Sequence, residues 1–349
     1  MYSVYLADLV GDVEGHFYFM QTLGKIKGAS YIDTCERKIL IKKYPIKGMM
    51  ERFRIYRKVF AEAKKQKGKK IVHFQTGDKF YFLPILFSPE TAECKVVITL
   101  HRCPVHPFMI ALLKNFARKI SKIVVLSDSL AKQLRAIGIH NVEVIEHPSF
   151  YDYSAIGTKE ELREKYGIST DKIILSALGG TRYDKGVDLL LDSLSLLTED
   201  ERRRIVCNIA GRPQDFDASY ITNSINRCRG VEVRVDLRNL SDTEFIENIK
   251  LTDWLVVPYR KSFTGVSGPM VEAISQGIPC IVPEDSSLSL FCAKYGAAKT
   301  FRGEDAHSLA ATIREIISRK ESLILSGIER LNRDYFVSKH IELYNTLYT

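Results

Sequence analysis

The sequence is poor in cysteine, and none of its seven cysteines forms a Cys-x-x-Cys pair. An odd number of scattered cysteines argues against a disulfide framework and a zinc site, and favours a reducing compartment. No apolar run reaches the roughly 18–20 residues that a membrane-spanning helix needs. Asp8, Asp12 and Glu14 fall where a signal peptide would keep an uncharged core. We therefore expect a cytoplasmic protein.

The 349 residues are 45% hydrophobic and 27% charged, as in a globular protein large enough for two domains. Charge is unevenly distributed. Residues 1–150 hold 25 Lys and Arg against 13 Asp and Glu, a balance of +12, whereas residues 151–349 hold 26 against 29, a balance of −3. The basic half favours an anionic partner: a membrane surface, a phosphate-bearing substrate or nucleic acid. A lysine-rich surface that only keeps the protein in solution is the alternative.

Short apolar runs alternate with amphipathic ones along the whole chain, which is typical of α/β layers around mostly parallel sheets. We expect strands at 2–9, 70–75, 95–100, 122–127 and 142–147, and then at 172–179, 204–211, 231–237, 253–259 and 279–284. We expect helices at 49–66, 105–119, 128–136, 186–197, 242–250, 268–276 and 305–318. A last helix near 332–347 carries aromatic residues at helical spacing. Between the halves, residues 148–165 show no strand period.

The helix expected near 49–66 is strongly basic. Its apolar face is formed by Met49, Phe53, Tyr56, Phe60 and Ala63. Its other faces carry Arg52, Arg54, Arg57, Lys58, Lys64 and Lys65. Because the aromatic residues fall on the apolar face and are not interleaved on one surface with the basic ones as on an RNA platform, we expect no nucleic-acid partner. Contact with an anionic membrane and plain solvation both remain open.

Two segments of the second half suit an anionic ligand. In the first, a strand ends at Gly179-Gly180 and a helix begins near Gly186, with Arg182 and Lys185 in the turn between them. Glycines allow a sharp turn, and two cations before a helix N-terminus suit a diphosphate. An ordinary loop with solvated cations is the alternative. No Gly-x-Gly-x-x-Gly fingerprint is present, which argues against an NAD-dependent enzyme.

The second segment is a Gly- and Ser-rich loop at 264–268 that follows a strand and opens a helix. The helix contains Glu272, whose carboxylate can accept two vicinal hydroxyls, as on a ribose. Taken alone, Glu272 fits an exposed helix position equally well.

The order and spacing of these residues resemble the retaining glycosyltransferases of the GT-B fold, in particular family 4. The shared pattern is Gly-Gly-x-Arg-x-x-Lys-Gly, then Ala-Gly at 210–211, then Pro-Tyr at 258–259, Glu-Ala at 272–273 and Gly-x-Pro at 277–279. The resemblance implies two Rossmann-like domains facing a cleft. Residues 1–150 would bind the acceptor and 165–330 the donor, and a helix at 331–349 would cross back to the N-terminal domain.

The resemblance also implies roles for individual residues. Arg182 and Lys185 would stabilise the leaving diphosphate, and Glu272 would bind the ribose. His101, just past a strand, would lie beside the donor sugar and complete the catalytic set. Further donor contacts would come from small residues: Gly11, Gly15, Gly180, Thr264, Gly265, Ser267 and Gly268. Acceptor contacts would come from Glu14 and His16.

One departure from the family pattern affects the expected activity. The family has a glutamate eight residues before Glu272 that contacts the donor sugar, and this chain has Thr264 there. We expect sugar transfer from a nucleotide diphosphate sugar, a UDP-sugar being favoured, to a glycan or lipid-linked acceptor in envelope or exopolysaccharide assembly. The alternative is a catalytically silent GT-B protein that binds a glycan or partners an active transferase. No Asp-x-Asp pair stands directly at the end of an expected strand, so we expect neither a metal nor another cofactor.

Overall fold

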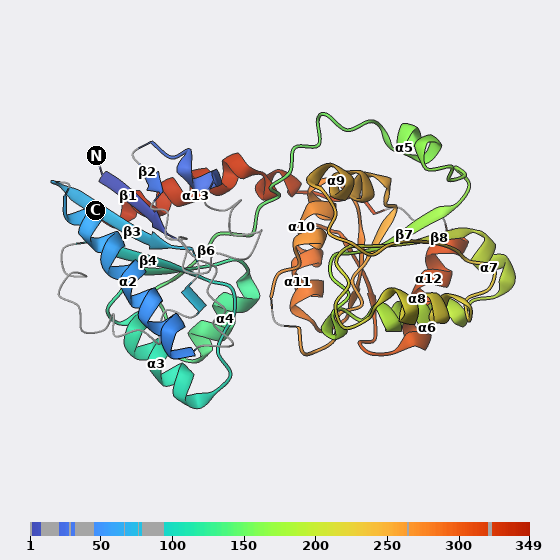
Figure 1. The fold of residues 1–349 in the computed structure, drawn as a ribbon, viewed down its shortest axis with the longest axis horizontal. Coiled ribbons are helices and arrows are strands. Elements are labelled where there is room, and N and C mark those ends of the chain that lie inside the picture. The colour runs from blue at the N-terminus through green and yellow to red at the C-terminus, as the bar shows by residue number, and fades with distance from the viewer. Residues whose placement is uncertain are drawn as a thin grey trace. The chain divides into compact units, whose positions relative to one another are not determined.

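The computed structural model describes residues 2–7, 21–27, 29–31, 45–65, 67–75, 77–78, 94–263, 265–319 and 323–349. The chain divides into two compact units (Figure 1). Unit 1 comprises residues 1–150 and 333–349, and unit 2 comprises residues 151–332.

Unit 1 contains a six-stranded sheet of order β2-β1-β3-β4-β5-β6, in which every pairing is parallel. Its strands are β1 (Tyr2–Ala7), β2 (Ala29–Tyr31), β3 (Lys69–Phe74), β4 (Lys95–Leu100), β5 (Lys122–Val125) and β6 (Val142–Val144). Its helices include α2 (Pro45–Lys64), α3 (Pro107–Ala117), α4 (Asp128–Ala136) and α13 (Arg333–Thr346). Since both faces of a parallel sheet are covered in such folds, the central strands are apolar throughout.

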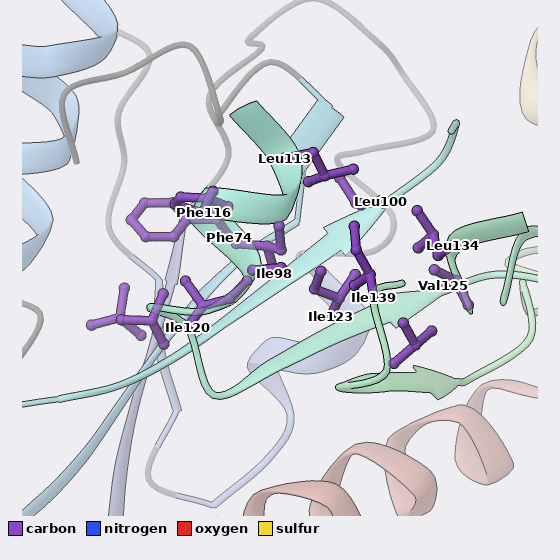
Figure 2. Close-up of a cluster of buried hydrophobic side chains, with 14 of the residues drawn as sticks. Phe74, Ile98, Leu100, Leu113, Phe116, Ile120, Ile123, Val125, Leu134 and Ile139 are labelled. Atoms are coloured by element: carbon purple, nitrogen blue, oxygen red, sulfur yellow. The ribbon is translucent and has the colours of Figure 1, made fainter. Parts of the chain in front are cut away.

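One face of this sheet packs against α2, α3 and α4. Alternate residues of β3, β4 and β5 point into the same core as the inward side chains of these helices. Figure 2 shows Phe74, Ile98 and Ile123 of the strands gathered with Leu113 and Phe116 of α3. The sequence pattern of the basic helix is confirmed where its side chains are described: Tyr56, Phe60 and Ala63 are fully buried. The side chains of Met49, Arg52 and Phe53 lie outside the described residues.

The other alternate residues of β3 and β4 meet α13, the helix that follows unit 2 in sequence and packs on unit 1. His73 of β3 is hydrogen-bonded to the Tyr344 hydroxyl through Nδ1 at 2.6 Å and to Thr99 Oγ1 through Nε2 at 2.9 Å. These groups are buried, so the hydrogen bonds replace those to water. The C-terminal helix therefore crosses back to the N-terminal domain, as expected.

Unit 2 contains a second parallel six-stranded sheet, of order β12-β11-β10-β7-β8-β9. Its strands are β7 (Ile173–Leu178), β8 (Ile205–Ala210), β9 (Glu232–Asp236), β10 (Trp254–Val256), β11 (Cys280–Pro283) and β12 (Ala298–Phe301). The sheet runs outward from β7 in both directions, so the order of strands reverses between β7 and β10. Ligands of doubly wound sheets bind at the carboxyl ends of the strands at this switch point.

Helices cover both faces of this sheet (Figure 1). One face carries α6 (Val187–Ser195), α8 (Ala218–Ile225) and α12 (Ala306–Arg319), and the other α9 (Asp242–Leu251), α10 (Gly268–Ser275) and α11 (Ser287–Ala293). Shorter elements are α5 (Lys159–Lys165), α7 (Glu199–Arg203) and the 3-10 helices η4 (Tyr183–Lys185) and η5 (Ile328–Leu331). Capping residues in the sequence stabilise the N-termini of these helices. Ser241 and Glu244, for example, form a capping box at α9.

The structure adds elements that the sequence pattern did not predict: β2, β12, α7, α8 and α11. The unpredicted strands are short, and in β12 three of the four residues are partly or fully exposed, so no apolar run marks it. The basic helix begins at Pro45 rather than near residue 49, because proline is tolerated in a first helical turn. Of the helices that the structure describes, none is long and apolar enough to cross a bilayer.

Candidate donor site in unit 2

The turn after β7 is shaped by glycines that face other backbone segments. Gly211, at the end of β8, has φ +136°, and a Cβ added there would lie 2.2 Å from the Gly179 carbonyl oxygen. A Cβ on Gly180 would lie 2.1 Å from Gln214 Oε1. A side chain at Gly211 would force the two backbone segments apart, whereas one at Gly180 would only have to displace the end of the Gln214 side chain. Gly211 thus allows the ends of β7 and β8 to approach each other closely.

Arg182, at the N-cap of η4, holds its own counter-ion. Its Nε and one Nη donate to the two carboxylate oxygens of Asp184, each at 2.8 Å. These hydrogen bonds raise the pKa of Arg182 above its usual value. A phosphate at this position would therefore meet a cation that is already oriented and partly neutralised.

Lys185 is placed differently. Its Nζ lies 5.5 Å from the centre of the Tyr259 ring, and a Cβ added to Gly179 would come within 2.8 Å of that Nζ. Among the described residues, no carboxylate pairs with it. The ammonium group thus lies against the glycine turn of β7 and the aromatic side chain that follows β10.

The loop after β10 reaches the same place. The Tyr259 hydroxyl is 3.0 Å from Ser267 Oγ, and Ser267 is the N-cap of α10 but makes no side-chain capping bond. Pro269 lies in the first turn of α10, where backbone N–H groups have no partner within the helix, so the missing N–H of proline costs no helical hydrogen bond. The first amides of α10 therefore lie next to the ring that Lys185 faces. Thr264 lies outside the described residues.

Glu272 lies in α10 and is 3% exposed. Its Oε2 accepts a hydrogen bond of 3.0 Å from the hydroxyl of Tyr153, which belongs to the first residues of unit 2. It is thus not an exposed helix residue, the alternative that the sequence left open. A buried carboxylate is stable when it is hydrogen-bonded, and this one has such a donor.

Arg260 and Asp188 are structural residues of the site that the sequence pattern did not single out. The Arg260 guanidinium donates to Asp188 Oδ1 at 3.0 Å and Oδ2 at 2.5 Å, and lies 3.8 Å from the Tyr183 ring centre. The sequence feature that could have pointed to this pair is Asp188 in the first turn of α6, because an acidic residue there suits the helix dipole. The pair joins the start of α6 to the end of β10, where a Cβ on Gly186 would lie 2.1 Å from Pro258 O.

An Asp-x-Asp pair does occur five residues after β8, at Asp215 and Asp217. Both carboxylates serve the backbone: Asp215 accepts from Tyr183 N at 2.8 Å, and Asp217 caps α8 by accepting from Tyr220 N at 2.8 Å. Across the described ranges, no cluster of three or more His, Cys, Asp or Glu is arranged for a metal ion.

His101 lies in unit 1, just past the carboxyl end of β4. Its Nε2 donates to the Gln75 carbonyl oxygen at 2.9 Å, because a carbonyl oxygen can only accept. Its backbone N–H and that of Arg102 both donate to Asp78 Oδ1, at 2.9 and 2.8 Å. Burial raises the pKa of Asp78, against the opposing effects of His101 and these two amides.

An open depression of about 470 Å³ on unit 1 is separate from this histidine. It is lined partly by Lys114 in the last turn of α3, and by Arg118 and His140 in the loops that lead into β5 and β6. These loops are at the amino ends of the strands, whereas His101 follows a carboxyl end.

The structure therefore brings together the predicted residues of unit 2. Gly180, Arg182 and Lys185 follow β7, and Gly265, Ser267, Gly268 and Glu272 follow β10, the strand paired with β7. The predicted residues Gly11, Glu14, Gly15 and His16 lie outside the described residues.

Comparison with known protein families gives a match over unit 2. Residues 158–324 match the family of glycosyl transferases group 1. Two curated relatives align with part of the chain. Alpha-D-kanosaminyltransferase of Streptomyces kanamyceticus is 27% identical over 44% of this chain and 40% of its own length. Mannosylfructose-phosphate synthase of Agrobacterium fabrum is 28% identical over 36% of this chain and 28% of its own length. The matched region thus spans less than half of either relative.

Solved structures resemble the whole chain. Sucrose-phosphate synthase from Thermosynechococcus elongatus has a TM-score of 0.74 at 12% identity, over 100% of this chain and 99% of its own. Anabaena HepE in complex with UDP has a TM-score of 0.74 at 13% identity, over 99% and 100%. At such identities the likeness shows the fold alone.

The two parallel sheets and these structural matches show the GT-B fold. The similarity to the glycosyl transferases group 1 family covers segment 158–324.

Proposed function

We propose that this chain is a retaining glycosyltransferase that moves a sugar from a nucleotide diphosphate sugar to an acceptor hydroxyl. The observation that carries this proposal is the convergence of two loops at the β7–β10 switch point. Lys185 Nζ, the Gly179 turn and the Tyr259–Ser267 pair at the start of α10 meet there. Cations and helix amides at one switch point suit a diphosphate.

In this reaction the bond from the anomeric carbon to the phosphate oxygen breaks and a bond to the acceptor oxygen forms. The acceptor proton passes to the leaving diphosphate, so no strong base is needed. The site must instead stabilise the charge on the leaving group, the role of Lys185 and Arg182. We infer that these side chains replace a metal ion there. His101 would lie beside the donor sugar, and Glu272 would bind the ribose.

A UDP-sugar is the favoured donor. The proposal draws support from the resemblance to Anabaena HepE, whose structures are described as complexes with UDP, UDP and glucose, and UDP-glucose. A thermal-shift screen of UDP, GDP, ADP and their sugars tests it, because a ligand that binds the folded state raises the melting temperature. We expect stabilisation by one nucleoside diphosphate and its sugar. No shift with any of them would contradict the donor site.

The silent alternative draws on Thr264, which replaces a family glutamate with a side chain that carries no charge. Slow hydrolysis of the nucleotide sugar without acceptor distinguishes the two functions. An active transferase releases free sugar, whereas a silent binding protein returns the donor intact. We expect release.

The acceptor is proposed to be membrane-linked, as in envelope or exopolysaccharide assembly. Unit 1 supports this through α2, whose exposed side chains include Arg54, Arg57, Lys58, Lys64 and Lys65. Near an anionic leaflet each basic residue contributes about 1 kcal/mol. A structural neighbour, WaaG, is described as a glycosyltransferase involved in lipopolysaccharide biosynthesis. The protein would then be a peripheral one at the inner face of the plasma membrane, receiving its donor from the cytoplasm.

Liposome co-sedimentation tests the membrane proposal. Binding should need anionic lipid and weaken as salt rises. It should fall when four exposed basic residues of α2 become Gln: Arg54, Arg57, Lys58 and Lys64. A matched control changes four exposed basic residues of unit 2: Arg203, Arg229, Lys261 and Arg302. Equal loss in both variants, or equal binding to neutral liposomes, would leave the charge of α2 as a solubility feature.

A further inference from the structure

Glu272 is held by the beginning of unit 2. Tyr153 is the third residue of unit 2, which begins directly after Phe150. Its ring packs in the core shared with α10, and its hydroxyl donates to Glu272 Oε2 at 3.0 Å. The residue is 8% exposed, so this hydroxyl has little access to water. A phenylalanine would fill the same core, and the hydroxyl therefore has a role that packing does not require.

The segment that carries Tyr153 is itself held in place. Lys250 of α9 donates through Nζ to the carbonyl oxygens of Tyr153, Ile156 and Gly157, at 3.1, 2.8 and 3.3 Å. The Tyr151 ring lies 5.1 Å from the Phe245 ring of the same helix, centre to centre. The phenol is thus oriented from a backbone that α9 restrains, and it can in turn orient a carboxylate.

We propose that Tyr153 is a positioning residue of the nucleoside site, which holds the Glu272 carboxylate in the rotamer that receives the two hydroxyls of the ribose. This inference rests on the proposed function, since it requires a nucleotide donor. A carboxylate has about four acceptor positions, so a hydrogen bond from Tyr153 to Oε2 is compatible with hydrogen bonds from two vicinal hydroxyls to the same group. A fixed carboxylate binds them without first losing rotamer freedom.

A second tyrosine–glutamate pair in unit 2 provides a matched control. The Tyr166 hydroxyl donates to Glu247 Oε2 at 2.5 Å, and Lys165 Nζ donates to the same carboxylate at 2.7 Å. This pair joins α5 to α9 and belongs to neither of the loops at the switch point. Loss of its hydroxyl removes the same chemical group from a place where no ribose is expected.

The experiment compares binding of a ribose and a deoxyribose nucleotide by calorimetry. The probe is whichever of UDP, GDP and ADP binds most tightly, with its 2′-deoxy counterpart. In the unmodified protein we expect the ribose form to bind about tenfold more tightly, since a hydrogen bond to a charged group is lost in the other. In Tyr153→Phe this ratio should fall at least about threefold, whereas Tyr166→Phe should leave it unchanged.

Glu272→Gln should bring the ratio close to one, and adding Tyr153→Phe to it should cause no further fall, because the tyrosine acts through the carboxylate. If Tyr153→Phe does not fold because Glu272 then lacks its hydrogen-bond donor, the comparison of Glu272→Gln with the double variant still tests the positioning role. Equal weakening of both nucleotides in Tyr153→Phe, with the ratio kept, would overturn the positioning role and leave the donor site standing. Failure of the unmodified protein to bind any of the three nucleotides would overturn the donor site and this role together.

Discussion

The two sheets of the molecule stabilise their polar groups in opposite ways. In unit 2 the polar groups at the carboxyl edge are charged and paired, as in Arg182 with Asp184 and Arg260 with Asp188. In unit 1 the polar groups beneath α13 are buried and neutral, with His73 between Tyr344 and Thr99. The carboxylates partly neutralise the two arginines, and Lys185, which pairs with no carboxylate of the described residues, leaves positive charge for an anionic ligand. The neutral buried groups of unit 1 serve packing. The edge of unit 2 is therefore where an anion can bind.

Removing the cations of unit 2 should have the largest effect. Replacing Lys185 or Arg182 with Ala should lower activity more than about tenfold, from the loss of about 1.5–3 kcal/mol of donor or transition-state binding. Steady-state kinetics with the preferred donor measures it. Lys172→Ala is the control, because Lys172 lies at the opposite end of β7 and pairs with Glu232. Normal turnover in both site variants would show that the phosphates bind elsewhere.

The glycine-shaped edge of unit 2 can be tested through stability. Gly186 and Gly167 have nearly the same backbone, φ +65° and +64°, but only the first would place a Cβ 2.1 Å from Pro258 O, whereas the second meets nothing within 4 Å. Gly167→Ala should cost about 1–2 kcal/mol of unfolding free energy from the left-handed backbone alone. Gly186→Ala should cost about 1–3 kcal/mol more from overpacking. Chemical denaturation measures both, and equal costs would contradict the close approach of α6 to β10.

The neutral polar groups of unit 1 should make it sensitive to acid. Burial lowers the pKa of His340 to about 4 and that of His73 well below its usual value, the latter helped by His340. The unfolded chain then binds more protons than the folded one below about pH 6.5, so stability is complete above that pH and falls towards pH 4. For His340 alone, the loss of unfolding free energy approaches about 3 kcal/mol as the pH falls.

Thermal unfolding between pH 7.5 and 4.5 measures this loss. In His340→Gln the dependence should be flatter, whereas His307→Gln, at an exposed position of unit 2, should follow the unmodified protein. An identical slope in all three proteins would mean that His340 does not titrate on unfolding.

Removal of metal should have the smallest effect. Because Lys185 and Arg182 are proposed to offset the charge of the leaving group, turnover should persist in EDTA. Complete loss of activity in EDTA, restored by Mg²⁺ or Mn²⁺, would replace this proposal with a metal-assisted one.

Much of the fold could be predicted because most of its central strands are buried apolar runs. All ten strands expected from the sequence lie within or overlap strands of the two sheets. The short edge strands β2 and β12 could not be predicted, since few apolar residues are needed where one side of a strand has no partner. In the candidate site, Arg182, Lys185 and Glu272 were singled out from their place beside glycine-rich loops, and their role in donor binding stays a prediction. Arg260 and Asp188 were not, because their pairing joins residues 72 positions apart.

The sequence by itself determined which loops are glycine-rich, which residues in them are charged and that two α/β layers follow one another, because these depend on local chemistry and periodicity. The tertiary structure alone decided which charges are already paired. Arg182 and Lys185 look equivalent in sequence, yet one faces Asp184 and the other the Tyr259 ring. It also placed the hydroxyl of Tyr153 against Glu272, 119 residues away. Such contacts depend on the order in which strands join the sheet, and no local pattern records it.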